Sequence, residues 1–365
     1  MAERQLNIAV VGSGIAGLSA AWLLSRAHRV TVFESLGSLG MDARSIDVDI
    51  SGRDFRIDVP LRVFYQGYYP QLTALYDETD IYYEPVDYSS SFSRLDGATY
   101  FHYSNWVKGK ISIPYIDPRN LAARPFRKLL QEVIRFFTRE KRALKNESLS
   151  TVTLEEFLQG RNYSTQFAND FLFPALAGIC TCKYDSVREY PADVVIDYFT
   201  RGLFFRGVRR VIGGTNEVVH RLTRDVERVF TGTHVKQVLQ KSNSLEIILN
   251  DGVIRDFDHV VIATAANHAR ALLGEQHHRE KEILAKFPYE KSRVVMHKDR
   301  ALAPKDMSSW APVNFLMRTG SDKPMATIWM NKVQQALRHE APIFQSWNPL
   351  LEPQEDLLLA EATFE

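Results

Sequence analysis

Near the N-terminus, the pattern of hydrophobic positions changes from a strand period to a helix period and back. Residues 6–12 form a short apolar, β-rich run, which is typical of a strand buried on both faces. Residues 14–27 carry apolar side chains at helical spacing, with Leu18 and Ala21 on the face that would meet a sheet. Residues 30–34 read Val-Thr-Val-Phe-Glu and predict a second strand. Strand, glycine turn, helix and strand in this order predict one βαβ unit.

The middle of the chain has a different texture. Residues 63–103 are dense in tyrosine and phenylalanine. A long helix with many basic side chains is predicted over residues 117–145, and further helices over 154–167 and 192–200. This block indicates a second structural region.

An α/β pattern returns after Gly213 and Gly214. A helix is predicted over residues 217–226. Strands are predicted over 234–240, 245–249, 253–257 and 258–264. The last of these runs ends in small residues, as a central parallel strand would.

These patterns predict an α/β fold in which a Rossmann-like dinucleotide-binding domain is split in the sequence. Residues 1–62 and 205–275 would form that domain. Residues 63–204 and 276–365 would form a second, mixed α+β domain that binds the substrate. A chain of 365 residues is long enough for two such domains.

Charge and cysteine content narrow the choice of partners. Lys and Arg number 45 against 44 for Asp and Glu, so nothing in the charge predicts a nucleic-acid partner. Cys180 and Cys182 are the only cysteines, too few for a disulfide framework or a cysteine metal site. We expect two buried thiols, a reducing compartment and no metal.

The apolar run over residues 8–24 resembles the hydrophobic part of a signal peptide or a membrane span. Gly12, Gly14 and Gly17 interrupt it, and neither a basic cluster nor a cleavage site accompanies it. A cytoplasmic protein is therefore expected.

The glycines at 12, 14 and 17 match the G-x-G-x-x-G pattern of dinucleotide-binding loops. Gly12 would allow the tight turn after the strand, Gly14 would let a pyrophosphate approach the helix N-terminus, and Gly17 would bring the helix close to the sheet. Glu34 ends the next strand, where a carboxylate accepts hydrogen bonds from the adenosine ribose.

The loop by itself does not separate FAD from NAD. The late strand and its small residues Ala263 and Thr264 favour FAD, because a dinucleotide could pass over that edge and a simple nicotinamide dehydrogenase does not need the strand. Val235 stands where a backbone N–H and C=O could hold the adenine, although an ordinary core valine remains an alternative.

Several stretches together resemble the superfamily of flavin-containing amine oxidases and phytoene desaturases. They are residues 10–24, 68–72, 211–215, 257–264 and 329–349. Within that superfamily the chain is similar to a branch of predicted NAD/FAD-binding proteins whose bacterial members often accompany cyclopropane-fatty-acid synthases. The likeness covers essentially the whole chain and implies FAD as the cofactor.

The chain departs from the superfamily pattern at two places. A glycine doublet usually follows the ribose-binding acid, whereas this chain has Met41, Asp42 and Arg44, of which Arg44 would bind phosphate. Relatives also continue beyond residues 347–349 into a glycine-rich flavin segment, which this sequence is expected to lack. The predicted cofactor-binding residues are Gly12, Ser13, Gly14, Ile15, Ala16, Gly17, Glu34, Ser35, Arg44, Val235, Ala263 and Thr264.

The resemblance implies oxidation or desaturation of a hydrophobic substrate, which could be a lipid, or of an amine, by hydride transfer to the flavin. A non-catalytic binding or scaffold protein is the alternative, and a nicotinamide-dependent dehydrogenase is a third possibility. No catalytic residue can be named. His297 and Lys298 could lie near the flavin, because members of the superfamily often place a lysine there, but surface positions are favoured for both and for His277-His278.

Two features would suit a hydrophobic substrate. The tyrosine-rich block could line a tunnel, or it could be ordinary packing. The basic segment 117–145 could contact an anionic membrane peripherally, or it could be a solvated helix face.

Overall fold

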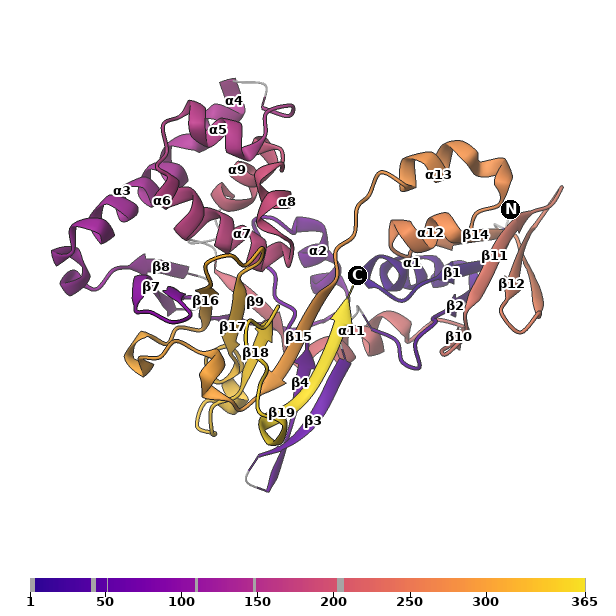
Figure 1. Cartoon of the computed structure of the whole chain (residues 1–365). Helices are drawn as coiled ribbons and strands as arrows, with labels where there is room; N and C mark the ends of the chain where they lie inside the picture. Colours follow the sequence, from indigo (N-terminus) through magenta and orange to yellow (C-terminus); the bar gives the residue numbers. More distant parts are fainter. Residues whose placement is uncertain are drawn as a thin grey trace. The chain divides into compact units, whose positions relative to one another are not determined.

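A computed structural model describes residues 4–40, 44–50, 52–108, 111–146, 149–201 and 207–364 (Figure 1). The chain forms two compact units, each assembled from separate segments of sequence. Unit 1 comprises residues 1–45, 74–82 and 211–290, and unit 2 comprises residues 46–73, 83–210 and 291–365.

Unit 1 is built on a four-stranded parallel sheet with strand order β10-β2-β1-β14. Its strands are β1 (Asn7–Val11), β2 (Arg29–Phe33), β10 (Arg228–Phe230) and β14 (His259–Ile262). β1 is the central strand, and its last four residues are buried because the strand is covered on both faces. The first βα unit therefore forms as the sequence pattern predicts.

Helices and a second small sheet cover the parallel sheet of unit 1 (Figure 1). The helices are α1 (Ile15–Ser25), α11 (Gly214–Thr223), α12 (Ala266–Leu272) and α13 (His278–Leu284), with a 3-10 turn over Glu275–His277. The antiparallel sheet consists of β11 (Val235–Gln240), β12 (Leu245–Leu249) and β13 (Ile254–Phe257). Its apolar face packs on Ala9, Val11 and Phe33 of the parallel sheet.

Unit 2 is built on an eight-stranded, mostly antiparallel sheet with strand order β19-β15-β18-β17-β16-β6-β7-β8. The strands are β6 (Ser90–Arg94), β7 (Thr99–Lys108), β8 (Ile111–Tyr115), β15 (Ser292–His297), β16 (Val313–Met317), β17 (Met325–Trp329), β18 (Phe344–Trp347) and β19 (Leu358–Phe364). Only β16 and β6 pair in parallel. In that pair Phe315 faces Phe92, and their rings stack at 4.8 Å.

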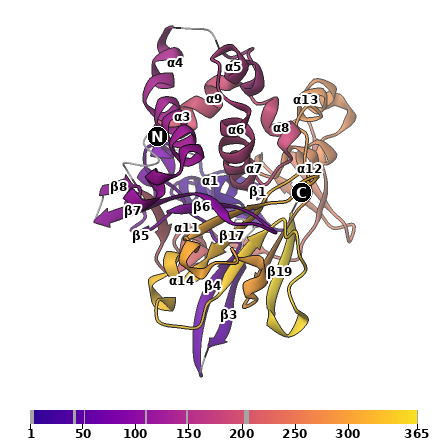
Figure 2. The same ribbon diagram turned by 60° about the vertical axis from the view of Figure 1, so that its left-hand side comes forward.

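A block of short helices covers one face of this sheet (Figure 2). It contains α3 (Arg124–Arg139), α4 (Ala143–Asn146), α5 (Leu154–Gly160), α6 (Thr165–Phe167), α7 (Phe173–Cys180), α8 (Tyr184–Arg188) and α9 (Ala192–Thr200), with shorter turns over Pro118–Ala122, Glu140–Arg142 and Ala168–Leu172. The core between helices and sheet is rich in phenylalanine.

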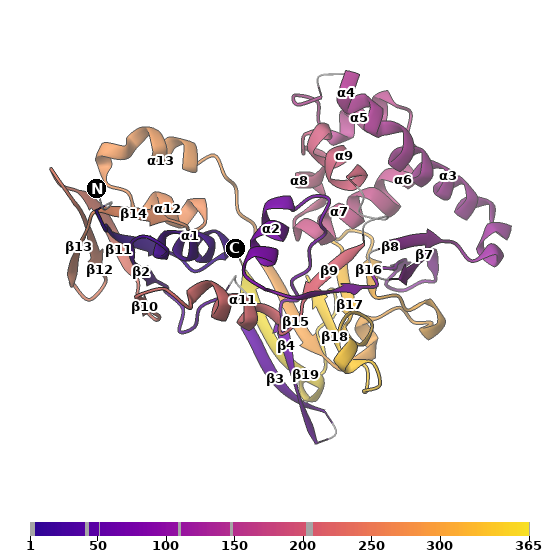
Figure 3. The same ribbon diagram turned by 180° about the vertical axis from the view of Figure 1, so that it is seen from behind.

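The other face is covered by a two-stranded ribbon of β3 (Arg44–Ile50) and β4 (Arg53–Val59), which packs on β15, β17 and β18 (Figure 3). A separate pair joins β5 (Tyr83–Val86) to β9 (Val208–Val211). Helix α2 (Pro70–Glu78) begins in unit 2 and ends in unit 1. The remaining elements are α14 (Met330–Val333) and short 3-10 turns over Arg300–Leu302, Met307–Ser309, Gln335–Leu337 and Glu355–Leu357.

The compact units differ from the predicted domains in four stretches. Residues 207–210, predicted in the dinucleotide-binding domain, lie in unit 2, where Val208 is buried. Residues 46–62, predicted in the dinucleotide-binding domain, lie in unit 2, because Val48, Ile57 and Val59 bury their side chains there. Residues 74–82 and 276–290, predicted in the substrate domain, lie in unit 1.

The single helix predicted over residues 117–145 is also wrong. Pro118 starts a 3-10 turn, Ala123 is extended, and Pro125 stands in the first turn of α3. Proline is favoured at a helix start and disfavoured inside one, so the pattern breaks into shorter pieces. Within the described residues, no helix is both long and apolar enough to cross a membrane.

Candidate functional site

The glycine loop joins β1 to α1, and two of its glycines are required by close backbone contacts. Gly12 has φ +100°, and a Cβ atom there would lie 2.7 Å from the carbonyl oxygen of Ala263. A Cβ atom on Gly17 would lie 2.0 Å from the carbonyl oxygen of Gly12. No side chain fits at either position without moving the backbone. These two glycines therefore shape the turn.

Gly14 has a different role, because nothing in the fold requires a glycine there. Its φ of −62° is open to any residue, and a Cβ atom would meet no described protein atom within 4 Å. The residue is the N-cap of α1, and within the described chain no side chain caps this helix. The first turn also holds no acidic residue. Backbone N–H groups at this helix start are thus available to an anion.

Ser13 and Glu34 form the polar centre of the loop. One carboxylate oxygen of Glu34 accepts hydrogen bonds from the backbone N–H and the hydroxyl of Ser13, at 3.0 and 2.6 Å. The other oxygen accepts from the backbone N–H of Leu36 at 2.8 Å and from the hydroxyl of Ser35 at 3.2 Å. The carboxylate at the end of β2 is held in one orientation beside the start of α1.

The remaining loop residues differ in exposure. Ile15 is half-buried as the first residue of α1, whereas Ala16 is exposed. The hydroxyl of Ser13 accepts a further hydrogen bond from the backbone N–H of Gly40 at 3.3 Å. This contact places the chain after β2 against the loop.

The predicted residues at the end of β14 lie beside the glycine turn. Ala263 donates its backbone N–H to Val11 at 2.8 Å, and the Thr264 methyl group lies 3.1 Å from the position of a Cβ atom on Gly12. Both residues are half-buried. The structure therefore brings the loop and the 263–264 edge together, as the sequence predicts.

Val235 belongs to the small antiparallel sheet, where it pairs with Leu249 next to a register shift. Its segment approaches Glu34, because Thr233 donates its backbone N–H to the Glu34 carbonyl at 2.8 Å. The Val235 side chain is half-buried against the core of unit 1. Contact with an adenine stays a prediction. Met41, Asp42 and the side chain of Arg44 lie outside the described residues.

The expectation of a surface role for His297 is wrong. This histidine lies in β15 with none of its surface exposed, and its Nε2 lies 2.8 Å from the hydroxyl of Ser346. Burial lowers the pKa of His297 to about 4, so the ring is neutral at pH 7. Lys298 is half-buried, whereas His278 is exposed.

The cysteines differ from the prediction as well. Cys180 is exposed at the end of α7, and Cys182 is partly exposed after the left-handed Thr181. Among the described residues, neither cysteine forms a disulfide. Helix α7 ends at Cys180, and the left-handed Thr181 separates the two cysteines. Within the described residues, no group of three or more His, Cys, Asp or Glu side chains is arranged to hold a metal.

The tyrosine-rich block contributes to a compact aromatic cluster in unit 2. Tyr65, Tyr68 and Tyr69 pack on one another, and Tyr65 and Tyr68 also pack on Tyr198 of α9, with ring centroids 4.9 to 6.0 Å apart. The Tyr65 hydroxyl donates to the Tyr198 carbonyl at 2.5 Å. Burial raises the pKa of Tyr65, so it remains protonated. Packing accounts for these contacts, and a substrate-lining role stays a prediction.

The basic segment 117–145 uses most of its apolar side chains inside the protein. Helix α3 buries Phe126, Leu129, Val133 and Phe136 in the core of unit 2. Leu121 and Ile134 remain exposed beside the basic residues. Peripheral membrane contact through this segment stays a prediction.

Comparison with protein families gives one match, to the NAD(P)-binding Rossmann-like domain over residues 10–79. This range covers the end of β1, the glycine loop, α1 and Glu34. Comparison with curated protein sequences gives no significant match.

Solved structures share the fold over nearly the whole chain. A CLA-producing fatty acid isomerase from P. acnes has a TM-score of 0.65 at 15% identity, covering 98% of this chain and 86% of that one. An oxidoreductase from Methanosarcina mazei has a TM-score of 0.64 at 16% identity, covering 98% and 88%. A variant of putrescine oxidase has a TM-score of 0.63 at 15% identity, covering 94% and 75%. This likeness confirms the predicted fold class: a Rossmann-like domain split in sequence, with a mixed second domain.

Proposed function

We propose that this protein is an FAD-dependent oxidoreductase that binds its cofactor at the glycine loop of unit 1. The observation that carries the proposal is the start of α1, which is uncapped, free of acidic side chains and open at Gly14. Helix N-termini of this kind hold the pyrophosphate of dinucleotides. Glu34 at the end of β2 supplies an acceptor for ribose hydroxyls beside it.

The serine contacts of Glu34 fit a ribose. Each carboxylate oxygen takes one backbone N–H and one serine hydroxyl. A ribose hydroxyl would replace a serine hydroxyl, while the backbone bonds from Ser13 and Leu36 keep the carboxylate in place. The negative charge would repel a ribose 2′-phosphate, which favours FAD or NAD over NADP.

Three considerations support FAD. The sequence resembles the flavin-containing amine oxidases and phytoene desaturases. The fold likeness extends through unit 2, far beyond the Rossmann-like part. The small residues Ala263 and Thr264 lie beside the glycine turn and would let a long dinucleotide cross this edge.

In the proposed reaction, bound FAD would supply the hydride acceptor. The contribution of unit 1 is to hold the cofactor through α1 and Glu34. The substrate would be hydrophobic, and a lipid acyl chain fits best, since a protein of the same fold is a fatty acid isomerase. An amine is the second choice, since another is an oxidase of putrescine.

The test is an anaerobic titration of the chain reconstituted with FAD. Unsaturated and saturated fatty acids and aliphatic amines are added in turn, and the flavin band near about 450 nm is followed. Loss of the band on addition of a substrate supports an oxidoreductase. A chain that retains FAD and is reduced by none of them supports the alternative of a binding protein.

A matched variant separates cofactor binding from folding. Gly14→Val puts bulk where the phosphates would lie, and its Cβ atom would meet no described atom within 4 Å. Flavin should therefore be lost while stability changes by about 1 kcal/mol or less. A Gly14→Val chain that retains stoichiometric flavin would contradict the assignment of the loop.

A further inference from the structure

Strand β9 carries two neighbouring arginines, Arg209 and Arg210. Among the described residues, only Arg210 has a counter-charge. Both are buried, with 3% of Arg209 and 8% of Arg210 exposed. Arg210 donates to the carboxylate of Glu84 at 2.7 Å. Arg209 instead donates from Nη1 to the carbonyl of Val208 at 3.3 Å, a long bond to a neutral group. Its Nη2 is buried and has no hydrogen-bond partner in the described part of the chain.

This arrangement is unfavourable unless something else binds there. A guanidinium keeps its charge at any ordinary pH, so it cannot avoid the penalty of burial by losing a proton. Burial lowers the pKa of Arg209, which shows that its surroundings disfavour the charged form. Buried charges in proteins are normally paired, whereas Arg209 has no ion-pair partner in the described part of the chain.

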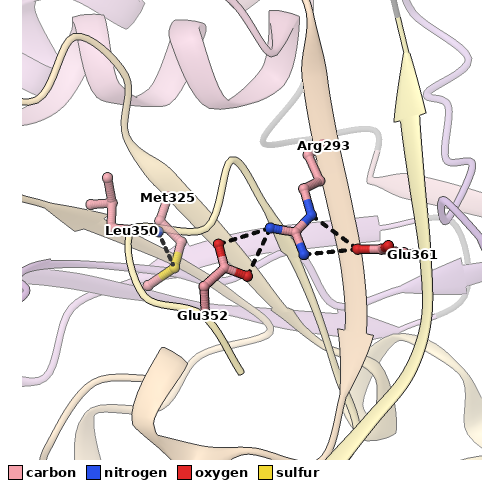
Figure 4. Close-up of polar contacts among 5 residues, drawn as sticks. All are labelled: Arg293, Met325, Leu350, Glu352 and Glu361. Atoms are coloured by element: carbon pink, nitrogen blue, oxygen red, sulfur yellow. Dashed lines mark hydrogen bonds and ion pairs between the residues drawn. The ribbon is translucent and has the colours of Figure 1, made fainter. Parts of the chain in front are cut away.

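Arg293, in the same unit, is an arginine with a structural role and provides a comparison. Its guanidinium lies between Glu352 and Glu361, at 2.8 and 2.7 Å (Figure 4). These bonds tie β15 to β19 and to the loop before it. The more exposed arginine thus has two carboxylates, while the buried one has none within ion-pair distance among the described residues.

The surroundings of Arg209 hold the side chain in place. Its backbone exchanges hydrogen bonds with Phe64 at 2.7 and 2.9 Å. Gly207 has φ +68°, and a Cβ atom there would lie 3.1 Å from Nη1 and 3.4 Å from the Cβ atom of Ser112. Tyr83 packs edge-on against Phe64. The neighbours are thus aromatic or small, and the guanidinium is oriented without being neutralised.

We propose that Arg209 binds the carboxylate of a hydrophobic monocarboxylic acid. One guanidinium balances one negative charge, which matches a carboxylate better than a phosphate dianion, and its planar fork suits a carboxylate. Calling this ligand the substrate rests on the proposed function. The binding itself does not, because it needs neither flavin nor turnover.

The test measures ligand binding by the full-length chain without added FAD. Laurate, methyl laurate and inorganic phosphate are titrated separately, with laurate below its micelle concentration, and affinity is read from calorimetry and thermal unfolding. Laurate should bind and raise the unfolding temperature. Methyl laurate, which has the same chain without the charge, should bind at least about thirtyfold more weakly.

Two variants locate the charge. Arg209→Met removes it and should weaken laurate binding at least about thirtyfold, while raising the unfolding temperature without ligand. Arg209→Lys keeps the charge but loses the fork, so it should bind laurate with intermediate affinity. Arg210→Lys is the matched control, because lysine can keep the pair with Glu84, and it should bind laurate as the wild type does.

Three results would overturn the proposal: equal affinity for laurate and methyl laurate, unchanged laurate binding by Arg209→Met, or protection by phosphate alone. Laurate binding by a chain that retains no flavin would support this site and contradict the proposed function. Flavin retention without laurate binding would support the proposed function and contradict a carboxylate site at Arg209.

Discussion

The start of α1 in unit 1 and the strand β9 in unit 2 both offer donors to an anion, but they differ in how the donors are made. Around Gly14 the donors are backbone N–H groups, which carry partial charges and exist wherever a helix begins. At Arg209 the donor is a full positive charge, buried without a described partner. The uncapped start of α1 changes the free energy of unfolding little. The buried charge of Arg209, in contrast, lowers the stability of the fold until a ligand binds.

This difference means that mutations at the two places should have opposite effects on stability. Removing ligand binding at Gly14 leaves the fold nearly unchanged, whereas removing it at Arg209 stabilises the chain. Variants at other positions in each unit show whether this contrast in stability is specific to Gly14 and Arg209.

The largest expected effect is on the free energy of unfolding when Gly17 is replaced. Gly17→Ala places a Cβ atom 2.0 Å from the Gly12 carbonyl oxygen, so the turn must shift. We expect a loss of about 3 kcal/mol or more in the free energy of unfolding, measured by chemical denaturation. Gly14→Ala is the control and should change it by less than about 1 kcal/mol. Equal losses for both variants would contradict the separate roles of the two glycines.

His297 is a buried base of unit 2 that, unlike Arg209, can lose its proton. Its folded-state pKa of about 4 lies below the usual value of 6.5. The unfolded chain therefore binds a proton first as the pH falls, and stability is lost between about pH 6.5 and pH 4, by up to about 3 kcal/mol.

The measurement is denaturation at several pH values in that window for the wild type and His297→Gln. Glutamine can still hydrogen-bond with Ser346 but does not titrate. The variant should show a shallower loss of stability on acidification. An identical pH dependence would show that other groups cause it.

The smallest effect is expected at Arg293, whose charge is paired with two carboxylates and whose side chain is 35% exposed. Arg293→Ala should lower stability by less than about 1 kcal/mol, and added salt should reduce the difference further. A loss as large as that of Gly17→Ala would mean that the clamp between β15 and β19 supports the whole of unit 2.

The sequence predicts unit 1 better than unit 2, and the reason is physical. Gly12, Gly14 and Gly17 describe a turn whose geometry depends on residues close in the chain and on one neighbouring strand. The spacing alone is therefore informative. By contrast, the ribbon over residues 46–59 has a short alternating pattern that does not reveal which sheet it covers, so it was expected in the wrong unit.

Buried polar groups are also difficult to predict from the sequence. His297 is followed by charged residues and looks exposed in the sequence, yet β15 is an inner strand between β18 and β19. Arg209 is one of 45 basic residues, and nothing local distinguishes it from Arg210. Its burial depends on pairing with Phe64, far away in the chain. The serine and backbone contacts that orient Glu34 are likewise visible only in three dimensions.

The most direct test of the central claim is the ratio of bound flavin to protein after incubation with FAD and desalting. We expect about one flavin per wild-type chain, read from the visible absorption band, with no loss when excess NAD is present. A wild-type chain that stays colourless, or flavin that NAD displaces completely, would contradict FAD binding at the glycine loop.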